Sequence, residues 1–158
     1  MKKHRVGIYV FWILLSEGVG ALAAWLTRED MEIYKLQINK PPLSPPAIVF
    51  PIVWILLYAL MGVGAARVAL SQRSAEKHNA LQSFFLQLAV NFSWTIIFFH
   101  LRLFGWSLGV LLALLGLVIW MTYRFSQIDK PAARIQVPYV LWLTFAAYLN
   151  AGVWYLNG

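Results

Sequence analysis

The chain has 158 residues, of which 61% are hydrophobic and 12% charged, and it carries a formal net charge of +7. Soluble domains have about 25% charged residues, so this composition excludes an ordinary soluble domain and a disordered chain. Cysteine does not occur in the sequence. Its absence excludes disulfides, thiolate chemistry and cysteine-ligated metal.

Apolar stretches long enough to cross a bilayer follow one another along the chain. These stretches are residues 6–26, 47–70, 80–101, 104–123 and 138–156. About 20 helical residues span about 30 Å of hydrocarbon. Runs such as 111–120 do not alternate as the strands of a membrane barrel do. The sequence therefore predicts an all-α membrane protein, with residues 1–158 forming a single domain of five transmembrane helices.

The first stretch follows Lys2, Lys3 and Arg5, a basic flank that also precedes cleaved signal peptides. It is long, however, and it ends at Trp25 and Leu26 without a small-residue cleavage pattern. We therefore expect a retained membrane helix.

Basic residues are divided unequally between the two ends of the predicted bundle. One end has nine, namely Lys2, Lys3, Arg5, Arg67, Arg73, Lys77, Arg124, Lys130 and Arg134. The other has four, namely Arg28, Lys35, Lys40 and Arg102. The positive-inside rule then predicts a cytoplasmic N-terminus and a C-terminus outside the cytoplasm. Because these residues lie in short loops and not in one groove, we expect no nucleic-acid partner.

The first connection, residues 27–46, is much longer than the others and has mixed charge. It ends in a proline series, Lys40-Pro41-Pro42-Leu43-Ser44-Pro45-Pro46, that favours stiff, extended backbone. Long structured loops are usually functional. We predict that residues 27–46 form a lid over the mouth of the bundle, with Lys40, Pro41, Pro45 and Pro46 as its characteristic residues.

Polar and aromatic side chains recur at helical spacing on the second, third and fifth stretches. They are Trp54, Tyr58 and Met61, then Gln87, Asn91, Trp94, Thr95 and Phe98, and finally Tyr139, Trp142, Ala146 and Asn150. One interpretation is an aromatic pocket for a flat, largely apolar ligand. The alternative is helix packing, in which amides between helices contribute about 0.6 kcal/mol each and bind nothing.

Seven of the eight tryptophans fall into two groups, and Trp12 is ambiguous between them. Those near the ends of the stretches are predicted to form a membrane-interface belt and are Trp25, Trp106, Trp120 and Trp154. Trp54, Trp94 and Trp142 lie deeper, beside the polar positions, where interfacial anchoring does not explain them.

Glu17 is a carboxylate in the middle of the first stretch. Such residues serve as proton relays or cation sites, but without a second buried charge nearby we expect a hydrogen bond to a neighbouring helix.

Gly105 and Gly109 form a GxxxG pattern that permits close helix approach, within the bundle or in a homodimer. The histidines lack metal-ligand spacing, so we expect no metal site; they are His4, His78 and His100.

Three ordered motifs resemble the translocator protein family, also called tryptophan-rich sensory proteins or peripheral-type benzodiazepine receptors. They are residues 50–58 (FPIVWILLY), residues 87–94 (QLAVNFSW) with Phe98 and Phe99, and residues 137–150 (VPYVLWLTFAAYLN). The Lys40-Pro41 element before paired prolines and the five expected helices extend the similarity over nearly the whole chain.

This resemblance implies a bundle, often dimeric, whose first loop closes over a pocket for porphyrins, benzodiazepine-type ligands and, in some members, cholesterol. The residues it implies for the pocket are Trp54, Tyr58, Asn91, Trp94, Phe98, Trp142, Ala146 and Asn150. Bacterial members are similar to sensors of tetrapyrrole level, light or stress. Some promote light-dependent breakdown of protoporphyrin, for which Trp54 and Trp142 would be the candidates. The resemblance implies no obligatory cofactor; porphyrin would be a ligand of the protein.

The chain departs from the family pattern in the lid and at its end. It has Tyr34-Lys35 where the family usually has a Trp-Tyr pair, and Leu43 where a further Trp is usual. The cholesterol motif requires Lys or Arg after its Tyr, whereas Tyr155 is followed by Leu156-Asn157-Gly158. The resemblance therefore does not extend to these lid contacts or to the cholesterol motif.

Three classes of function remain open. A ligand-binding sensor is the first, and a transporter for porphyrin or sterol-like lipid is the second. Transporters usually show duplicated repeats and helices broken at the midplane, which this sequence does not indicate. An enzyme is the third, although no nucleophile with its base, and no metal set, can be assembled from the sequence.

Overall fold

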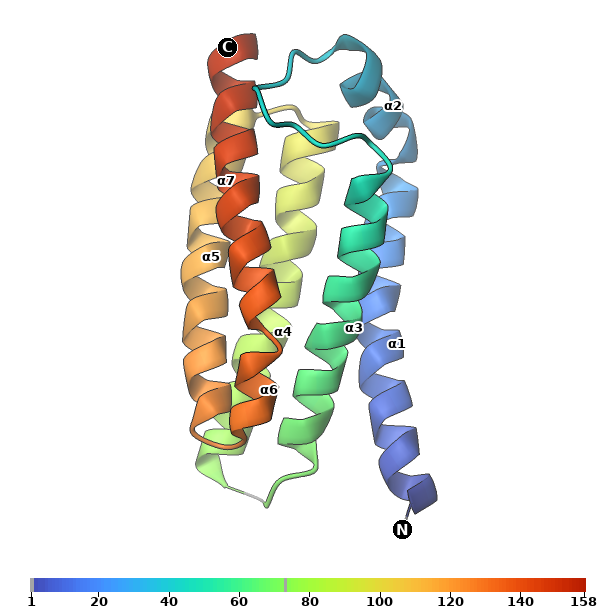
Figure 1. Cartoon of the computed structure of the whole chain (residues 1–158), viewed down its shortest axis with the longest axis vertical. Helices are drawn as coiled ribbons and strands as arrows, with labels where there is room; N and C mark the ends of the chain where they lie inside the picture. Colours follow the sequence, from blue (N-terminus) through green and yellow to red (C-terminus); the bar gives the residue numbers. More distant parts are fainter. Residues whose placement is uncertain (1, 73) are drawn as a thin grey trace.

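The computed structural model of the chain describes residues 2–72 and 74–158. Arg73, one of the basic residues counted above, lies outside the described residues. Within them, five helical segments are long and apolar enough to cross a membrane, and they run side by side (Figure 1). This confirms the predicted all-α membrane bundle.

The membrane helices match the predicted stretches to within a few residues at most ends. They are α1 (Lys2–Leu26), α3 (Val49–Ala69), α4 (Ala75–Thr95) with its π-helical continuation η1 (Ile96–His100), α5 (Phe104–Ser126) and α7 (Val137–Asn157), which the short α6 (Lys130–Arg134) precedes. The start of α4 was predicted too late, because polar residues extend the helix beyond its apolar part. Ser74 caps it by accepting a hydrogen bond from the Lys77 amide at 3.1 Å.

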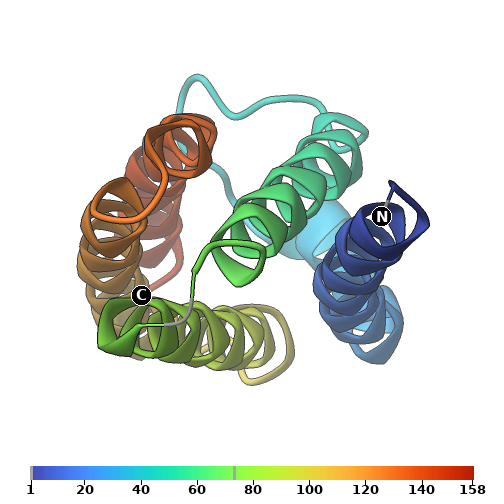
Figure 2. The ribbon, with the colours of Figure 1, turned by 90° about the horizontal axis from the view of Figure 1, so that it is seen from below.

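Seen along the bundle, α1 and α3 form one side, α5 and α7 the other, and α4 joins them (Figure 2). Small residues bring α1 and α3 close together. A Cβ on Gly62 would lie 2.5 Å from the Ile13 Cα, and one on Gly20 would lie 2.4 Å from the Tyr58 ring. The backbones can approach because these side chains are absent. Between α3 and α7, by contrast, aromatic rings meet: Phe50 contacts Trp142, and Trp54 contacts Tyr139.

Residues 27–46, the lid, were predicted to be a long loop of mixed charge. The structure shows that part of this segment is helical. Its first half is α2 (Arg28–Gln37), with Glu29 and Asp30 in the first turn and Lys35 in the last. Charges in this order favour a helix through its macrodipole, which explains why a segment without an apolar run is helical. The rest of the lid has no regular secondary structure; it runs from α2 to the side of α7 near its C-terminal end and then turns back to the start of α3 (Figure 1).

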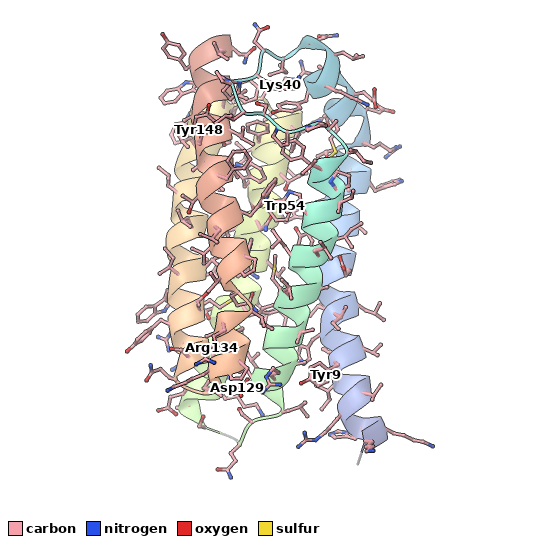
Figure 3. All side chains as sticks on the ribbon, viewed as in Figure 1. Tyr9, Lys40, Trp54, Asp129, Arg134 and Tyr148 are labelled. Atoms are coloured by element: carbon pink, nitrogen blue, oxygen red, sulfur yellow. The ribbon has the colours of Figure 1, made fainter. Side chains whose placement is uncertain are left out.

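At the opposite end of the bundle, the Asp129 side chain joins α6 to α3. Its carboxylate caps α6 by accepting a hydrogen bond from the Ala132 amide at 3.1 Å. It also forms an ion pair with Arg67 at the end of α3. The Arg67 guanidinium lowers the pKa of the Asp129 carboxyl, and the hydrogen bond from Ala132 acts in the same direction. Figure 3 shows Asp129 at this end, close to α3 and α6.

Replacing Asp129 by alanine removes both the cap and the ion pair. We expect the free energy of unfolding at pH 7 to fall by about 1 kcal/mol, the usual cost of a lost Asp cap. Because the folded-state pKa of Asp129 is lowered, its contribution is complete above the ordinary pKa of about 4 and is lost as the pH falls through the lowered value. Thermal unfolding in detergent at several pH values measures this. A difference from wild type that does not shrink in acid would contradict the assignment, and Glu32→Ala, exposed on α2, is the control.

Candidate functional site

A network of hydrogen bonds joins α3, α4 and α7 in the middle of the bundle. The Asn91 Nδ2 donates to the Tyr139 hydroxyl at 2.7 Å, and this hydroxyl donates to the Gln87 Oε1 at 2.8 Å. The Tyr58 hydroxyl donates to the Asn91 Oδ1 at 3.4 Å. All four side chains are buried. We call these residues, Tyr58, Gln87, Asn91 and Tyr139, the central network.

A second group of hydrogen bonds lies nearer the lid and centres on Asn150 of α7. Its Oδ1 accepts from the Trp94 Nε1 at 3.0 Å and from the Ser107 Oγ at 3.1 Å. Its Nδ2 donates to the Phe104 carbonyl oxygen at 2.9 Å. Asn150 therefore connects α4, α5 and α7 and uses both ends of its amide.

The amides thus act as hydrogen-bonding groups between helices, which was the packing interpretation of the sequence. Asn91 and Asn150 already have partners on both amide atoms, so they hold the helices in register and need no ligand to satisfy them. What they hold in place is a group of aromatic rings.

We call Trp54, Tyr58, Trp94, Phe98 and Tyr139 the aromatic cluster. Trp54 lies at its centre, with ring centroids 5.6 Å from Tyr58, 6.4 Å from Trp94 and 6.3 Å from Tyr139. The Trp94 ring continues to Phe98 at 5.5 Å. Figure 3 shows Trp54 directed from α3 toward the interior of the bundle. The structure therefore brings together most of the predicted site residues, from three helices.

Trp142 lies beside this cluster, against other rings. Its centroid is 5.8 Å from that of Phe50 on α3 and 5.6 Å from that of Phe145. Its indole Nε1 is buried, and no acceptor for it is found among the described residues. A buried donor without a partner costs about 1–3 kcal/mol. Ala146, one turn further along α7, is buried.

The lid is attached to α7 through its extended half. The Tyr148 hydroxyl donates to the Pro42 carbonyl oxygen at 2.6 Å, and the Asn157 side chain bonds both backbone groups of Asn39 at 3.0 and 2.8 Å. Pro41 is buried against Gly152, where a Cβ would come within 2.4 Å of the Pro41 Cβ. Figure 3 shows the lid crossing above Tyr148.

Lys40 does not point into the aromatic cluster. Its ammonium donates to the Lys35 and Ile38 carbonyl oxygens at 3.1 Å each and lies 4.9 Å from the centroid of the Tyr34 ring. It thereby fastens the end of α2 to the extended half of the lid. Pro45 is half-buried and Pro46 exposed, and both precede α3.

The helical half of the lid lies on η1. The Tyr34 ring centroid is 5.6 Å from that of Phe98 and 5.3 Å from that of Phe99, and burial there raises the pKa of Tyr34 to about 12. Asp30 accepts from the His100 ring at 3.1 Å. These contacts were missed from the sequence because a π-helical turn shifts the register of the aromatic residues after Thr95.

Two further predictions can be compared with the structure. Glu17 is half-buried on α1, and within the described residues its carboxylate has no hydrogen bond to a neighbouring helix, so that expectation was wrong. The neighbouring Ser16 hydroxyl donates a hydrogen bond within its own helix, to the Trp12 carbonyl oxygen. Across residues 2–72 and 74–158, no group of three or more metal-ligating side chains is assembled.

Comparison with known proteins agrees with this arrangement. The model of the TspO/MBR family matches residues 12–156. The chain belongs to this family. It is 35% identical over 149 residues to the translocator protein of Bos taurus, covering 93% of this chain and 88% of the relative. It is 38% identical over 144 residues to the tryptophan-rich sensory protein of Cereibacter sphaeroides, covering 91% and 88%. Protein CrtK of Rhodobacter capsulatus is 42% identical over 123 residues, covering 76% of each chain.

Changing Asn150 to alanine leaves the buried Trp94 indole N–H without its acceptor, whereas the Phe104 carbonyl oxygen loses one donor and keeps the Ser107 hydroxyl. We expect this TspO/MBR protein to lose about 1–3 kcal/mol of stability, the cost of unsatisfied buried polar groups. Thermal unfolding in detergent gives the value. Asn79→Ala, which alters an exposed amide on α4, is the matched control. Equal unfolding temperatures for the two variants would show that Asn150 does not hold these helices together.

Proposed function

We propose that this TspO/MBR family member is a membrane sensor that binds tetrapyrroles, such as protoporphyrin or a haem-type macrocycle, and benzodiazepine-type ligands. The ligand binds under the lid, between the aromatic cluster and Trp142. Ring walls suit flat apolar ligands because stacking and burial stabilise them together. Three observations support this proposal: the family membership, the aromatic cluster, and the lid at the same end of the bundle.

The buried Trp142 Nε1 without an acceptor carries the proposal. The side-chain N–H groups of Asn91, Trp94 and Asn150 each donate to an acceptor. The Trp142 Nε1 has no acceptor among the described residues. Protoporphyrin has propionate oxygens that accept hydrogen bonds, and benzodiazepine-type ligands have a carbonyl oxygen. Supplying that acceptor recovers the desolvation cost of the indole, so the interaction favours the bound state.

Binding requires the rings and the lid to move apart, because rings of α3 and α7 contact each other at Phe50–Trp142 and Trp54–Tyr139. The lid is suited to this movement. Its hydrogen bonds to α7, from Tyr148 and Asn157, lie at exposed positions where water competes with them. The central network lies deeper and keeps α3, α4 and α7 in register while the lid opens.

A photochemical role follows from the same geometry. A bound porphyrin absorbs light and supplies the reactive chemistry, and the protein holds an oxidisable indole beside it. Trp54 and Trp142 are the candidates, because both are half-buried and border the proposed site. Cholesterol is not part of the proposal, since the Lys or Arg of its motif is lacking after Tyr155.

We further propose that the N-terminus faces the cytoplasm and that the lid and C-terminus face the other side. The two ends lie at opposite ends of the bundle, and the end with the N-terminus has the larger share of basic residues (Figure 1). A homodimer through the exposed helix faces also remains a proposal.

Titration with protoporphyrin in darkness tests the binding proposal. We expect wild type to shift the Soret band saturably. Trp142→Phe, which keeps a ring but removes the N–H, should bind about tenfold more weakly, as for one lost hydrogen bond of ~1.4 kcal/mol. Trp120→Phe, on the exposed surface of α5, should match wild type. Equal affinity in all three proteins would disprove the role of Trp142.

Transport is the second candidate, favoured by the name translocator protein that several relatives carry. Transporter sites typically lie at discontinuous helices near the midplane. Here α1, α3, α5 and α7 are continuous, and the π-helical turn of α4 lies at its lid end.

Vesicles containing the purified protein separate the two candidates. A sensor is expected to bind protoporphyrin without increasing its flux across the membrane above that of protein-free vesicles. Flux that rises with protein content and falls in Trp142→Phe would instead establish transport through the same site.

A further inference from the structure

A separate cavity of about 470 Å³ lies on the outer surface of the bundle, at its lid end, between the start of α5 and the end of α7. We call it the Arg102 groove; six of its lining residues are Arg102, Gly105, Trp106, Gly109, Trp154 and Gly158. None of them belongs to the central network or the aromatic cluster. We propose that this groove binds the phosphate of a membrane phospholipid, with an acyl chain lying along α5.

The charge of the groove comes from Arg102. The residue is exposed, and within residues 2–72 and 74–158 its guanidinium pairs with no carboxylate. The first turn of α5 also lacks an acidic side chain. A guanidinium forms two parallel hydrogen bonds with phosphate oxygens, which makes phosphate its fitting partner at a membrane surface.

The backbone of Arg102 adds a second observation. Its φ is +54°, in the left-handed region that residues other than glycine rarely adopt. This conformation joins η1 to α5 in a tight turn. Such strain costs about 1–2 kcal/mol. The turn places Arg102 beside the cavity.

The walls of the groove are aromatic and fit the glycerol and acyl parts of a lipid. The Trp106 side chain is 76% exposed, and the Trp154 side chain is 48% exposed. The Trp154 indole lies over Gly105, where a Cβ would be 3.0 Å from its Cε2 atom. Gly109 lines the groove, and a Cβ built there would meet no neighbouring side chain within 4 Å. Tryptophans are enriched at this depth, where one side contacts headgroups and the other acyl chains.

The apolar walls decide between a lipid and a free phosphate ion. An inorganic phosphate would contact Arg102 and leave both indole rings unused. A phospholipid uses the guanidinium and the rings together. The observations therefore favour the phosphate of a lipid over a free ion.

Native mass spectrometry of the protein in detergent, titrated with phosphatidylglycerol, tests this inference. We expect wild type to retain one lipid under conditions where Arg102→Gln retains about tenfold less, as for one lost charge-assisted contact. Gly109→Leu fills the open part of the groove without touching the charge or meeting another side chain, and should reduce retention similarly.

Arg28→Gln is the matched control, since Arg28 is at the same end but lies over the Trp25 ring and donates to the Trp25 carbonyl oxygen. It should retain lipid as wild type does. Retention within twofold of wild type in both Arg102→Gln and Gly109→Leu would overturn the proposal. So would displacement of the lipid by millimolar inorganic phosphate, because this would show that the rings contribute nothing. The protoporphyrin titration is unaffected by either groove variant if the two sites are separate.

Discussion

One constraint governs the structure: an amide or hydroxyl group inside a membrane bundle must find its hydrogen-bond partner within the protein, because lipid offers none. The Tyr139 hydroxyl meets this requirement for two neighbours, accepting from Asn91 and donating to Gln87. Asn150 does the same for Trp94 and Ser107. Each helix rotation that would break these bonds leaves several buried groups unpaired, so the network fixes which faces of α3, α4, α5 and α7 point inward.

The aromatic site depends on that orientation. Once Asn91 faces Tyr139, the helical spacing directs Trp94 and Phe98 to the same side of the bundle, where they meet Trp54 from α3. The centre of the bundle and the lid are held in place by different interactions. Buried hydrogen bonds hold the centre, whereas the lid is held by ring contacts of Tyr34 and by exposed hydrogen bonds from α7. This difference between a centre with buried hydrogen bonds and a lid with exposed ones supports the proposed binding site.

The sequence predicts most of this because hydrophobic length and the helical period are local properties. It places the membrane helices and puts Asn91, Trp94 and Asn150 on inward faces. It does not predict that Trp142 contacts Phe50 from another helix, because that contact depends on how α3 and α7 are spaced. The helix α2 is missed because its stability comes from charge order rather than apolar periodicity, and the π-helical turn is missed because no single residue signals it. Of these features, only the contact of Trp142 with Phe50 arises between segments distant in the chain.

A double-mutant cycle between Asn91 and Tyr139 tests the central constraint most directly, using Asn91→Leu, Tyr139→Phe and the combined variant. The unfolding free energy of each protein is measured in the same detergent. If the two side chains share buried hydrogen bonds, the combined loss is smaller than the sum of the single losses by about 1 kcal/mol or more. Single losses that simply add, to within about 0.3 kcal/mol, would show that the bundle does not depend on this network.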